Sequence, residues 1–228
     1  MPKLAICIPC MDEMPVPTVL SLLSLYAFVI DHPLYKDVDE KNDVSIFIER
    51  NSLLVSSRQN LIQRALDWDA EWILMLDSDM TFPADTFHQL AKHSKPVVAC
   101  NYVKRVVPTV PITKDFDNSI IYTDRDTTGL QKAKFTGFGV CLVHSEVFRN
   151  IPPPWFDTQW IKDNETGSLD ILGEDVFFFE AMRHFTKQDL WIDHDLSQHV
   201  QHVGQFEYHN SLGGATRDTY EDGESTST

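Results

Sequence analysis

Two carboxylates one residue apart follow an apolar run in ILMLDSDMTFP, residues 73–83. In a strand, Asp77 and Asp79 would point to the same face, where their like charges repel. A hard divalent cation would remove that repulsion, because both carboxylates could supply it with oxygen ligands. With water and a ligand's diphosphate completing its shell, such a cation would form a metal site at the end of a buried strand. The alternative is that Asp79 caps the following turn while Asp77 accepts a backbone hydrogen bond.

Three other segments carry groups suited to chemistry at such a site. GEDVFFFEAM (173–182) has two carboxylates where a helix should begin, and these are either reactive groups or an acidic cap. HVQHVG (199–204) places His202 before a glycine, as a ligand or as a structural histidine. TGFGV (136–140) has two glycines that would let the backbone approach a ligand, or that mark a bulge.

The composition indicates a soluble, acidic, globular protein. With 228 residues, 43% of them hydrophobic, the chain can bury the core of one domain. Asp and Glu number 34 against 19 Lys and Arg, and the net charge of −15 argues against a broad nonspecific grip on nucleic acid. No segment has the roughly 18 apolar residues of a membrane span, and the N-terminus lacks a signal-peptide pattern. We therefore expect a cytoplasmic protein.

The four cysteines do not have the pattern of a disulfide framework. Cys7 and Cys10 have C-x-x-C spacing, but no second pair follows, and the pair ends a predicted strand instead of opening a helix. Three of the four cysteines lie in apolar runs, so we expect buried thiols instead of redox or zinc chemistry.

Alternating strand and helix patterns predict a mostly parallel α/β sheet with helices on both faces. Short apolar runs predict strands at 4–10, 44–50, 72–79 and 96–103. Helical spacing predicts helices at 17–30, 56–68 and 83–93. Ligands of such sheets bind beyond the carboxyl ends of the strands. The ends of the first and third strands and the start of the second helix should therefore share one crevice.

The second half of the chain is less regular. Short strands and glycine turns predict an antiparallel insert at about 104–135, a stretch with a positive charge balance. A helix is predicted at 176–185 and a strand at 190–196. Residues 213–228 are polar and acidic, so we expect a mobile tail after a single domain of residues 1–212.

The order of these motifs resembles that of small bacterial and bacteriophage GT-A glycosyltransferases, similar to glycosyltransferase family 2. The resemblance covers roughly residues 3–208 and depends on the joint order of the motifs. They are the first strand end IPC, then SSRQNL, LDSDM, VACNYVKR, KFTGFGVCLV, PPPWF, LGEDVFFF and HVG.

The resemblance implies a GT-A, Rossmann-like α/β fold and transfer of a sugar from a nucleotide sugar, of which UDP-sugar is the expected donor. Asp77 and Asp79 match the D-x-D motif that holds Mn²⁺ or Mg²⁺ against the diphosphate. His202 matches the late histidine that completes the metal shell, and His199 is a weaker candidate.

The resemblance also places the donor. The first loop, which embraces the nucleotide, is matched by Pro9, Cys10, Met11 and Asp12. Arg58 matches a basic position near the phosphates, and Ser78 lies between the two carboxylates. Gly137, Phe138 and Gly139 match the segment that faces the sugar.

The E-D pair would carry the reaction if the enzyme inverts configuration, because the acceptor hydroxyl must lose a proton as it attacks. Asp175 is the preferred base and Glu174 the alternative. We favour inversion, with retention as the other mechanism.

The acceptor is predicted only as a hydroxyl. The candidates are a surface or cell-wall glycan, a small molecule, a protein side chain and a hydroxylated base of phage DNA such as 5-hydroxymethylcytosine. The DNA base would place a phage enzyme in the bacterial host cytoplasm. For DNA, the basic insert would contact phosphates and Trp155 would stack on an extruded base. Trp155 and Phe156 are either such a platform or a buried anchor.

Two other functions use similar residues. A nucleotidyltransferase would want a glycine-rich or lysine-marked phosphate loop, which MPKLAICIPCMDEMP lacks. A non-catalytic sugar-binding domain of the same fold would be favoured by loss of the motif carboxylates, all of which are present.

Overall fold

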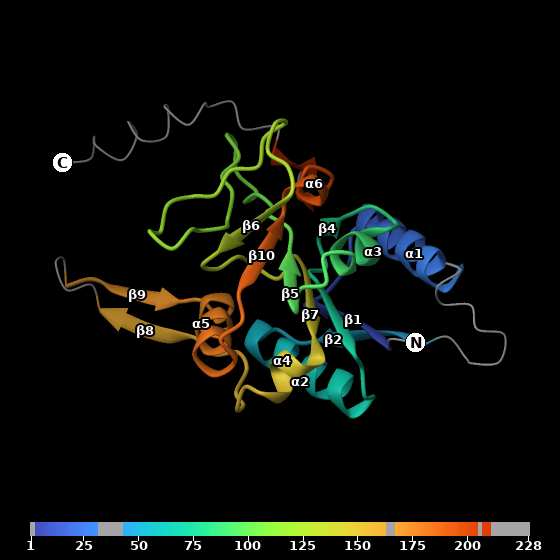
Figure 1. Ribbon diagram of the computed structural model, residues 1–228, viewed down its shortest axis with the longest axis horizontal. Coiled ribbons are helices and arrows are strands. Elements are labelled where there is room, and N and C mark those ends of the chain that lie inside the picture. The colour runs from blue at the N-terminus through green and yellow to red at the C-terminus, as the bar shows by residue number, and fades with distance from the viewer. Residues whose placement is uncertain (1–2, 32–42, 163–166, 205–206, 211–228) are drawn as a thin grey trace.

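A seven-stranded mixed sheet runs through the protein (Figure 1). The computed structural model describes residues 3–31, 43–162, 167–204 and 207–210. The strand order is β2-β1-β3-β7-β5-β10-β6. The strands of this sheet are β1 (Leu4–Cys10), β2 (Val44–Arg50), β3 (Trp72–Leu76), β5 (Val97–Ala99), β6 (Leu130–Ala133), β7 (Val140–His144) and β10 (Leu190–Asp193). Five of them run in one direction, and β7 and β6 run antiparallel to their neighbours. The predicted mostly parallel α/β class is confirmed.

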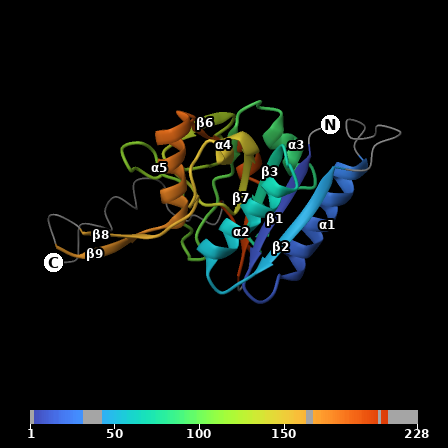
Figure 2. The same cartoon turned by 90° about the horizontal axis from the view of Figure 1, so that it is seen from below.

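Helices cover both faces of this sheet (Figures 1 and 2). The helices are α1 (Val16–Asp31), α2 (Leu54–Asp67), α3 (Thr86–Ala91), α4 (Ser145–Arg149), α5 (Glu174–Thr186) and α6 (His194–Ser197). The apolar side chains of α2, α4 and α5 share one core cluster, and those of α1, α3 and α6 share another. Strand alternation divides β1 between the two clusters, with Ala5 and Cys7 in the first and Leu4, Ile6 and Ile8 in the second.

Two smaller sheets complete the fold. One has the order β12-β11-β4, with β4 (Met80–Thr81), β11 (Gln201–Val203) and β12 (Glu207–Tyr208). The other is a hairpin of β8 (Gln159–Lys162) and β9 (Leu169–Leu172), which projects from the body beside α5 (Figure 1). The sequence patterns predicted neither of them.

Three local predictions need correction. β3 ends at Leu76, so the two carboxylates lie in the turn after the strand, and strand alternation does not describe their directions. β7 lies just beyond the predicted insert and pairs between β3 and β5 in the central sheet, a place that the sequence patterns did not predict. Residues 104–129 contain isolated antiparallel bridges instead of regular strands, and β6 then joins the sheet edge against β10. The predicted tail, 213–228, lies outside the described residues.

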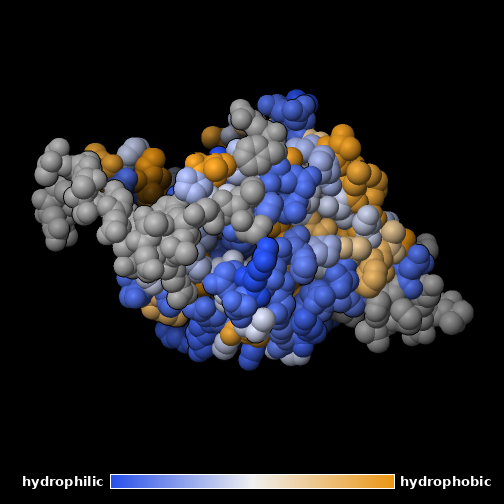
Figure 3. All heavy atoms as spheres, turned by 90° about the horizontal axis from the view of Figure 1, so that it is seen from above, coloured by the Kyte–Doolittle hydropathy of each residue, from blue (hydrophilic) through white to orange (hydrophobic). Residues whose placement is uncertain are grey.

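Apolar side chains gather on the surface over α1 (Figure 3). Val16, Leu20 and Leu23 are exposed there, and α1 carries no charged residue before Asp31. In the described ranges, no helix combines the length and the apolar character needed to cross a bilayer.

All four cysteines are free and buried. Cys7 and Cys10 both lie within β1, three residues apart, so their side chains point to opposite faces of the strand. This geometry prevents a disulfide between them, and buried thiols are what the structure shows.

Candidate functional site

The site lies where β1, β3 and β5 end and β7 begins. The N–H of Asp77, the first residue after β3, donates to the Gly139 carbonyl at 3.1 Å, which fixes the turn to the start of β7. Parallel strands end at one edge of a sheet, so the loops after β1 and β5 reach this edge as well. The predicted crevice edge is therefore where the candidate residues gather.

Arg58 joins two of the predicted carboxylates. Its Nη2 donates to Asp77 Oδ1 at 2.9 Å, and its Nη1 donates to Glu174 Oε1 at 2.6 Å. The Arg58 side chain is only 3% exposed and lies over the ring of Phe138, 5.1 Å from its centroid. Burial alone would lower the pKa of Arg58, but the two carboxylates outweigh it and raise that pKa. Arg58 therefore stays charged and ties the turn after β3 to the start of α5.

Asp79 has different partners. Its Oδ2 lies 3.2 Å from His202 Nε2 and 3.1 Å from Arg105 Nη1. His202 Nδ1 lies 3.0 Å from the Val103 carbonyl, an arrangement that leaves Nε2 directed at Asp79. Burial favours the neutral form of Asp79, but the bond and charge of His202, together with Arg105, lower its pKa overall. The same bond raises the pKa of His202 against the effect of its burial.

The small sheet explains how His202 reaches Asp79 across 123 residues of sequence. In the β4–β11 pair, His202 is opposite Met80, the residue that follows Asp79. The Val203 N–H also donates to the Asp79 carbonyl at 2.7 Å. Backbone pairing thus fixes the distance between the two side chains.

The donor set around Asp79 suits a divalent cation that also binds a substrate. Among the described residues, no group of three or more His, Cys, Asp or Glu side chains is arranged to hold a metal by itself. Mg²⁺-type sites commonly use one or two protein ligands with phosphate and water supplying the rest. A carboxylate and an imidazole 3.2 Å apart meet that requirement. Asp77 stays apart from them in its contact with Arg58.

Asp175 opens α5 beside this cluster. Its Oδ1 accepts the Val176 N–H at 2.7 Å, which orients the carboxylate. Burial, and then the charge of Glu174, raise the pKa of Asp175. Glu174 is bound by Arg58, so the two adjacent carboxylates have different environments.

The glycines of TGFGV make room for a tyrosine. A Cβ on Gly137 would lie 2.2 Å from Tyr102 Oη, and one on Gly139 would lie 2.6 Å from the Tyr102 ring. The Gly139 N–H donates to Tyr102 Oη at 3.2 Å. Phe138 between them is fully buried and packs on Phe178 and other rings of α5. The Phe138 side chain is therefore a core residue beneath the site and does not face a sugar.

The first loop is open at the same edge. Pro9 and Cys10 are buried residues of β1, whereas Met11 and Asp12 beyond the strand are exposed. Asp12 Oδ1 lies 3.7 Å from Arg50 Nη2 at the end of β2. Ser78 is half-buried between the two carboxylates. Of the predicted nucleotide contacts in this loop, the exposed pair has side chains open to a ligand.

Three other candidates, Trp155, Phe156 and His199, do not join the cluster. Trp155 is 5% exposed, and its Nε1 donates to the carbonyls of Phe148 and Ile151 at 2.9 and 3.1 Å. Phe156 is buried as well, so the buried anchor, and not the platform, is what these aromatics form. His199 is exposed and lines a surface cavity with residues of α3 and α6.

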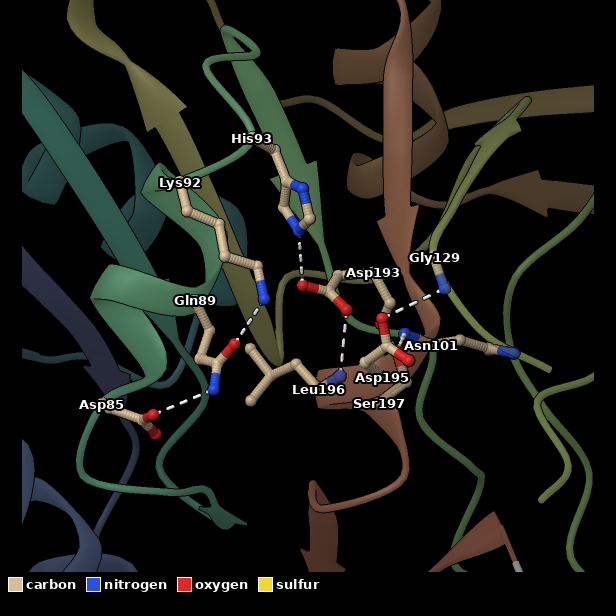
Figure 4. A network of polar contacts seen from close by, with 10 residues as sticks. All are labelled: Asp85, Gln89, Lys92, His93, Asn101, Gly129, Asp193, Asp195, Leu196 and Ser197. Carbon is tan, nitrogen blue, oxygen red and sulfur yellow. Dashed lines mark hydrogen bonds and ion pairs between the residues drawn. The ribbon is translucent and has the colours of Figure 1, made fainter. Parts of the chain in front are cut away.

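A second polar network supports the segment that follows β5 (Figure 4). His93 Nε2 lies 2.7 Å from Asp193 Oδ2, and Asp193 Oδ1 accepts the Leu196 N–H at 2.9 Å, which caps α6. The Asn101 N–H donates to Ser197 Oγ at 2.8 Å. These bonds hold the backbone directly before the tyrosine and arginine that reach the site.

Sequence reasoning missed the site roles of Tyr102 and Arg105. Arg105 was considered only as part of a basic insert, although it bonds Asp79. The available signal was position: both residues come at the end of a predicted strand whose carboxyl end lies at the same sheet edge as the D-x-D turn.

Comparisons with known proteins agree with this architecture. The sequence profile of the Anp1 family, a GT-A-like mannosyltransferase family, matches residues 28–135, which include the turn after β3. No curated protein matches the chain in sequence.

Two solved structures show the likeness in fold. A197 from STIV superposes with a TM-score of 0.57 at 17% identity, over 89% of this chain and 86% of that chain. GalNAc-T7, solved with UDP, GalNAc and Mn²⁺, superposes with a TM-score of 0.55 at 12% identity, over 91% of this chain. The match covers only 45% of the GalNAc-T7 chain. The chain therefore has the GT-A-like fold of the glycosyltransferases.

Proposed function

We propose that this protein transfers a sugar from a nucleotide sugar to an acceptor hydroxyl with the help of a divalent cation. The observation that carries the proposal is the meeting of Asp79 and His202 at the carboxyl end of β3, 3.2 Å apart. The fold, the family profile over the D-x-D turn, and the UDP and Mn²⁺ in the GalNAc-T7 structure all support it.

Asp79 and His202 would hold Mn²⁺ or Mg²⁺, and Asp77, oriented by Arg58, is the third candidate ligand. When bound, the cation stabilises negative charge on the departing nucleoside diphosphate. The exposed Met11 and Asp12 are the proposed contacts to the nucleotide. A UDP-sugar is the expected donor, and GDP-sugars are the second group to test.

Asp175 is the proposed base that takes the acceptor proton. Its raised pKa brings it closer to the operating range of a general base. Arg58 holds the neighbouring Glu174 in an ion pair, which favours Asp175 for this role. A base on the acceptor side corresponds to inversion of configuration.

The basic insert does not favour DNA as the acceptor. Lys132 pairs with Asp189 at 2.6 Å, Arg105 pairs with Asp79, and Lys134 donates to Asn118. The buried Trp155 offers no stacking surface. We therefore propose the hydroxyl of a glycan or a small molecule before that of a modified DNA base.

A donor screen tests the function. Purified protein is incubated with UDP- and GDP-sugars and Mn²⁺, and release of nucleoside diphosphate is measured with and without EDTA. We expect slow metal-dependent hydrolysis of one donor class, lost in Asp79→Ala and kept in the control Asp85→Ala on the nearby α3 turn. Donor binding without any turnover would indicate a sugar-binding module. Release of pyrophosphate from a nucleoside triphosphate and a sugar phosphate would indicate a nucleotidyltransferase.

A further inference from the structure

We propose that Arg105 competes with the divalent cation for Asp79 in the free protein and becomes a ligand of the donor diphosphate in the complex. This inference rests on the proposed function. Asp79 Oδ2, the carboxylate oxygen that faces His202, already lies 3.1 Å from Arg105 Nη1 and 3.2 Å from His202 Nε2. A cation that binds this oxygen must therefore displace the guanidinium.

The chain makes room for this arginine. A Cβ on Gly204, two residues after His202, would lie 3.0 Å from Arg105 Cδ and 3.5 Å from its Cγ. It would also lie 2.9 Å from the ring of Tyr208 on β12. Because Gly204 has no side chain, it leaves room for the aliphatic part of the Arg105 side chain, which extends past this residue to Asp79.

The two arginines of the site differ in their freedom to move. Arg58 is 3% exposed and bonds two carboxylates, whereas the side chain of Arg105 is 53% exposed and lies in an exposed segment, 104–108. An exposed ion pair contributes little stability. Arg105 can therefore leave Asp79 easily, and Arg58 cannot leave Asp77.

The chemistry of the guanidinium gives it a second place to bind. A planar fork of N–H donors matches the geometry of phosphate oxygens. When the cation takes Asp79, the donor's diphosphate brings two or more negative charges to the same position, within reach of a displaced side chain. Arg105 should then oppose binding of the cation alone and favour binding of the cation with nucleotide.

The test measures two affinities of the full chain with opposite expected signs. Free Mn²⁺ is titrated alone by electron paramagnetic resonance, and UDP is titrated by calorimetry at saturating Mn²⁺. In Arg105→Met, we expect Mn²⁺ alone to bind more tightly, by up to about fivefold. UDP should bind more weakly, by about tenfold. Arg105→Lys, which keeps the charge without the fork, should show a smaller loss for UDP.

Lys104→Met is the matched control, because it removes an equal charge from the neighbouring exposed residue. This control should change the affinities for Mn²⁺ and for UDP only slightly, and the changes should depend on salt, as expected for a distant charge. Equal or weaker binding of Mn²⁺ alone in Arg105→Met, or unchanged UDP binding, would overturn the inference. If the wild-type protein binds Mn²⁺ but Asp79→Ala does so equally, the assignment of the metal site itself fails. If that variant loses Mn²⁺ and the arginine variants change nothing, only the role of Arg105 fails.

Discussion

Four carboxylates gather around the end of β3 and the start of α5, and each has its own environment. Asp77 and Glu174 share the buried Arg58, and Asp79 faces a histidine and a second, exposed arginine. Asp175 has burial and a like-charged neighbour as the main influences on its proton affinity. Similar side chains can thus have different chemical roles, because an opposite charge favours the ionised form of a carboxylate and burial favours its protonated form.

The raised pKa of Asp175 predicts how turnover depends on pH. A base must be ionised, so kcat should rise with pH through the pKa of Asp175, at a higher pH than for an ordinary aspartate, whose pKa is about 3.9. Glu174→Gln removes a charge that raises this pKa, and so should move the rise to lower pH. Asp175→Asn should lower kcat by about 10²–10⁴-fold and leave donor affinity unchanged. A pH series of initial rates with the identified donor and acceptor checks these expectations.

Glu180→Gln is the matched control for Asp175→Asn, because it removes an exposed carboxylate from the same helix. It should leave the pH profile in place. A pH profile that Glu174→Gln does not move, or an Asp175→Asn variant with wild-type kcat, would rule out Asp175 as the base.

At the scale of elements, Arg58 joins α2, the turn after β3 and the first turn of α5. Removing it leaves two partly buried carboxylates without a counter-charge, which typically destabilises a protein by about 3–5 kcal/mol. We expect Arg58→Met, which keeps most of the apolar volume, to lower the free energy of unfolding by about that amount. Urea denaturation followed by circular dichroism measures it.

The same helix provides the comparison for Arg58. Arg64 lies in α2 and pairs with Glu49 at 3.3 Å, but its side chain is 46% exposed, against 3% for Arg58. Such a pair contributes about 0–1 kcal/mol. Arg64→Met should therefore shift the urea midpoint only slightly. Equal shifts in Arg58→Met and Arg64→Met would show that Arg58 does not stabilise the contact between α2, the turn after β3 and α5.

Local pattern predicted the elements better than their pairing. The strands at 4–10 and 44–50 have the predicted bounds. The strands β8 and β9 were not predicted, since they are exposed and lack the alternation that burial imposes. The motifs indicated Asp79 and His202, but not their distance. That distance depends on the β4–β11 pairing between segments 120 residues apart, which no local pattern encodes.

At the scale of the whole molecule, the charge distribution is part of the proposed chemistry. A chain with a net charge of −15 repels a nucleotide sugar and attracts a divalent cation. Arg58 and Arg105 offset this repulsion at the site. Arg58 is fixed between carboxylates, and Arg105 is exposed. Binding of the nucleotide sugar therefore depends on these two cationic side chains. Removing one of them should lower nucleotide affinity more than the same change would in a protein without net charge.

The cysteines can test whether both layers of the protein unfold together as one domain. Cys7 lies in the core cluster with α2, α4 and α5, and Cys100 in the cluster with α1 and α3. Burial raises the pKa of Cys7 to about 12 and that of Cys100 well above its ordinary value, so neither forms the reactive thiolate near pH 8 until it is exposed. We expect both to be labelled by iodoacetamide with the same urea dependence, read by peptide mass spectrometry in a Cys10→Ser background. A lower urea midpoint for one of them would mean that its layer opens separately, and the single-domain prediction would be wrong.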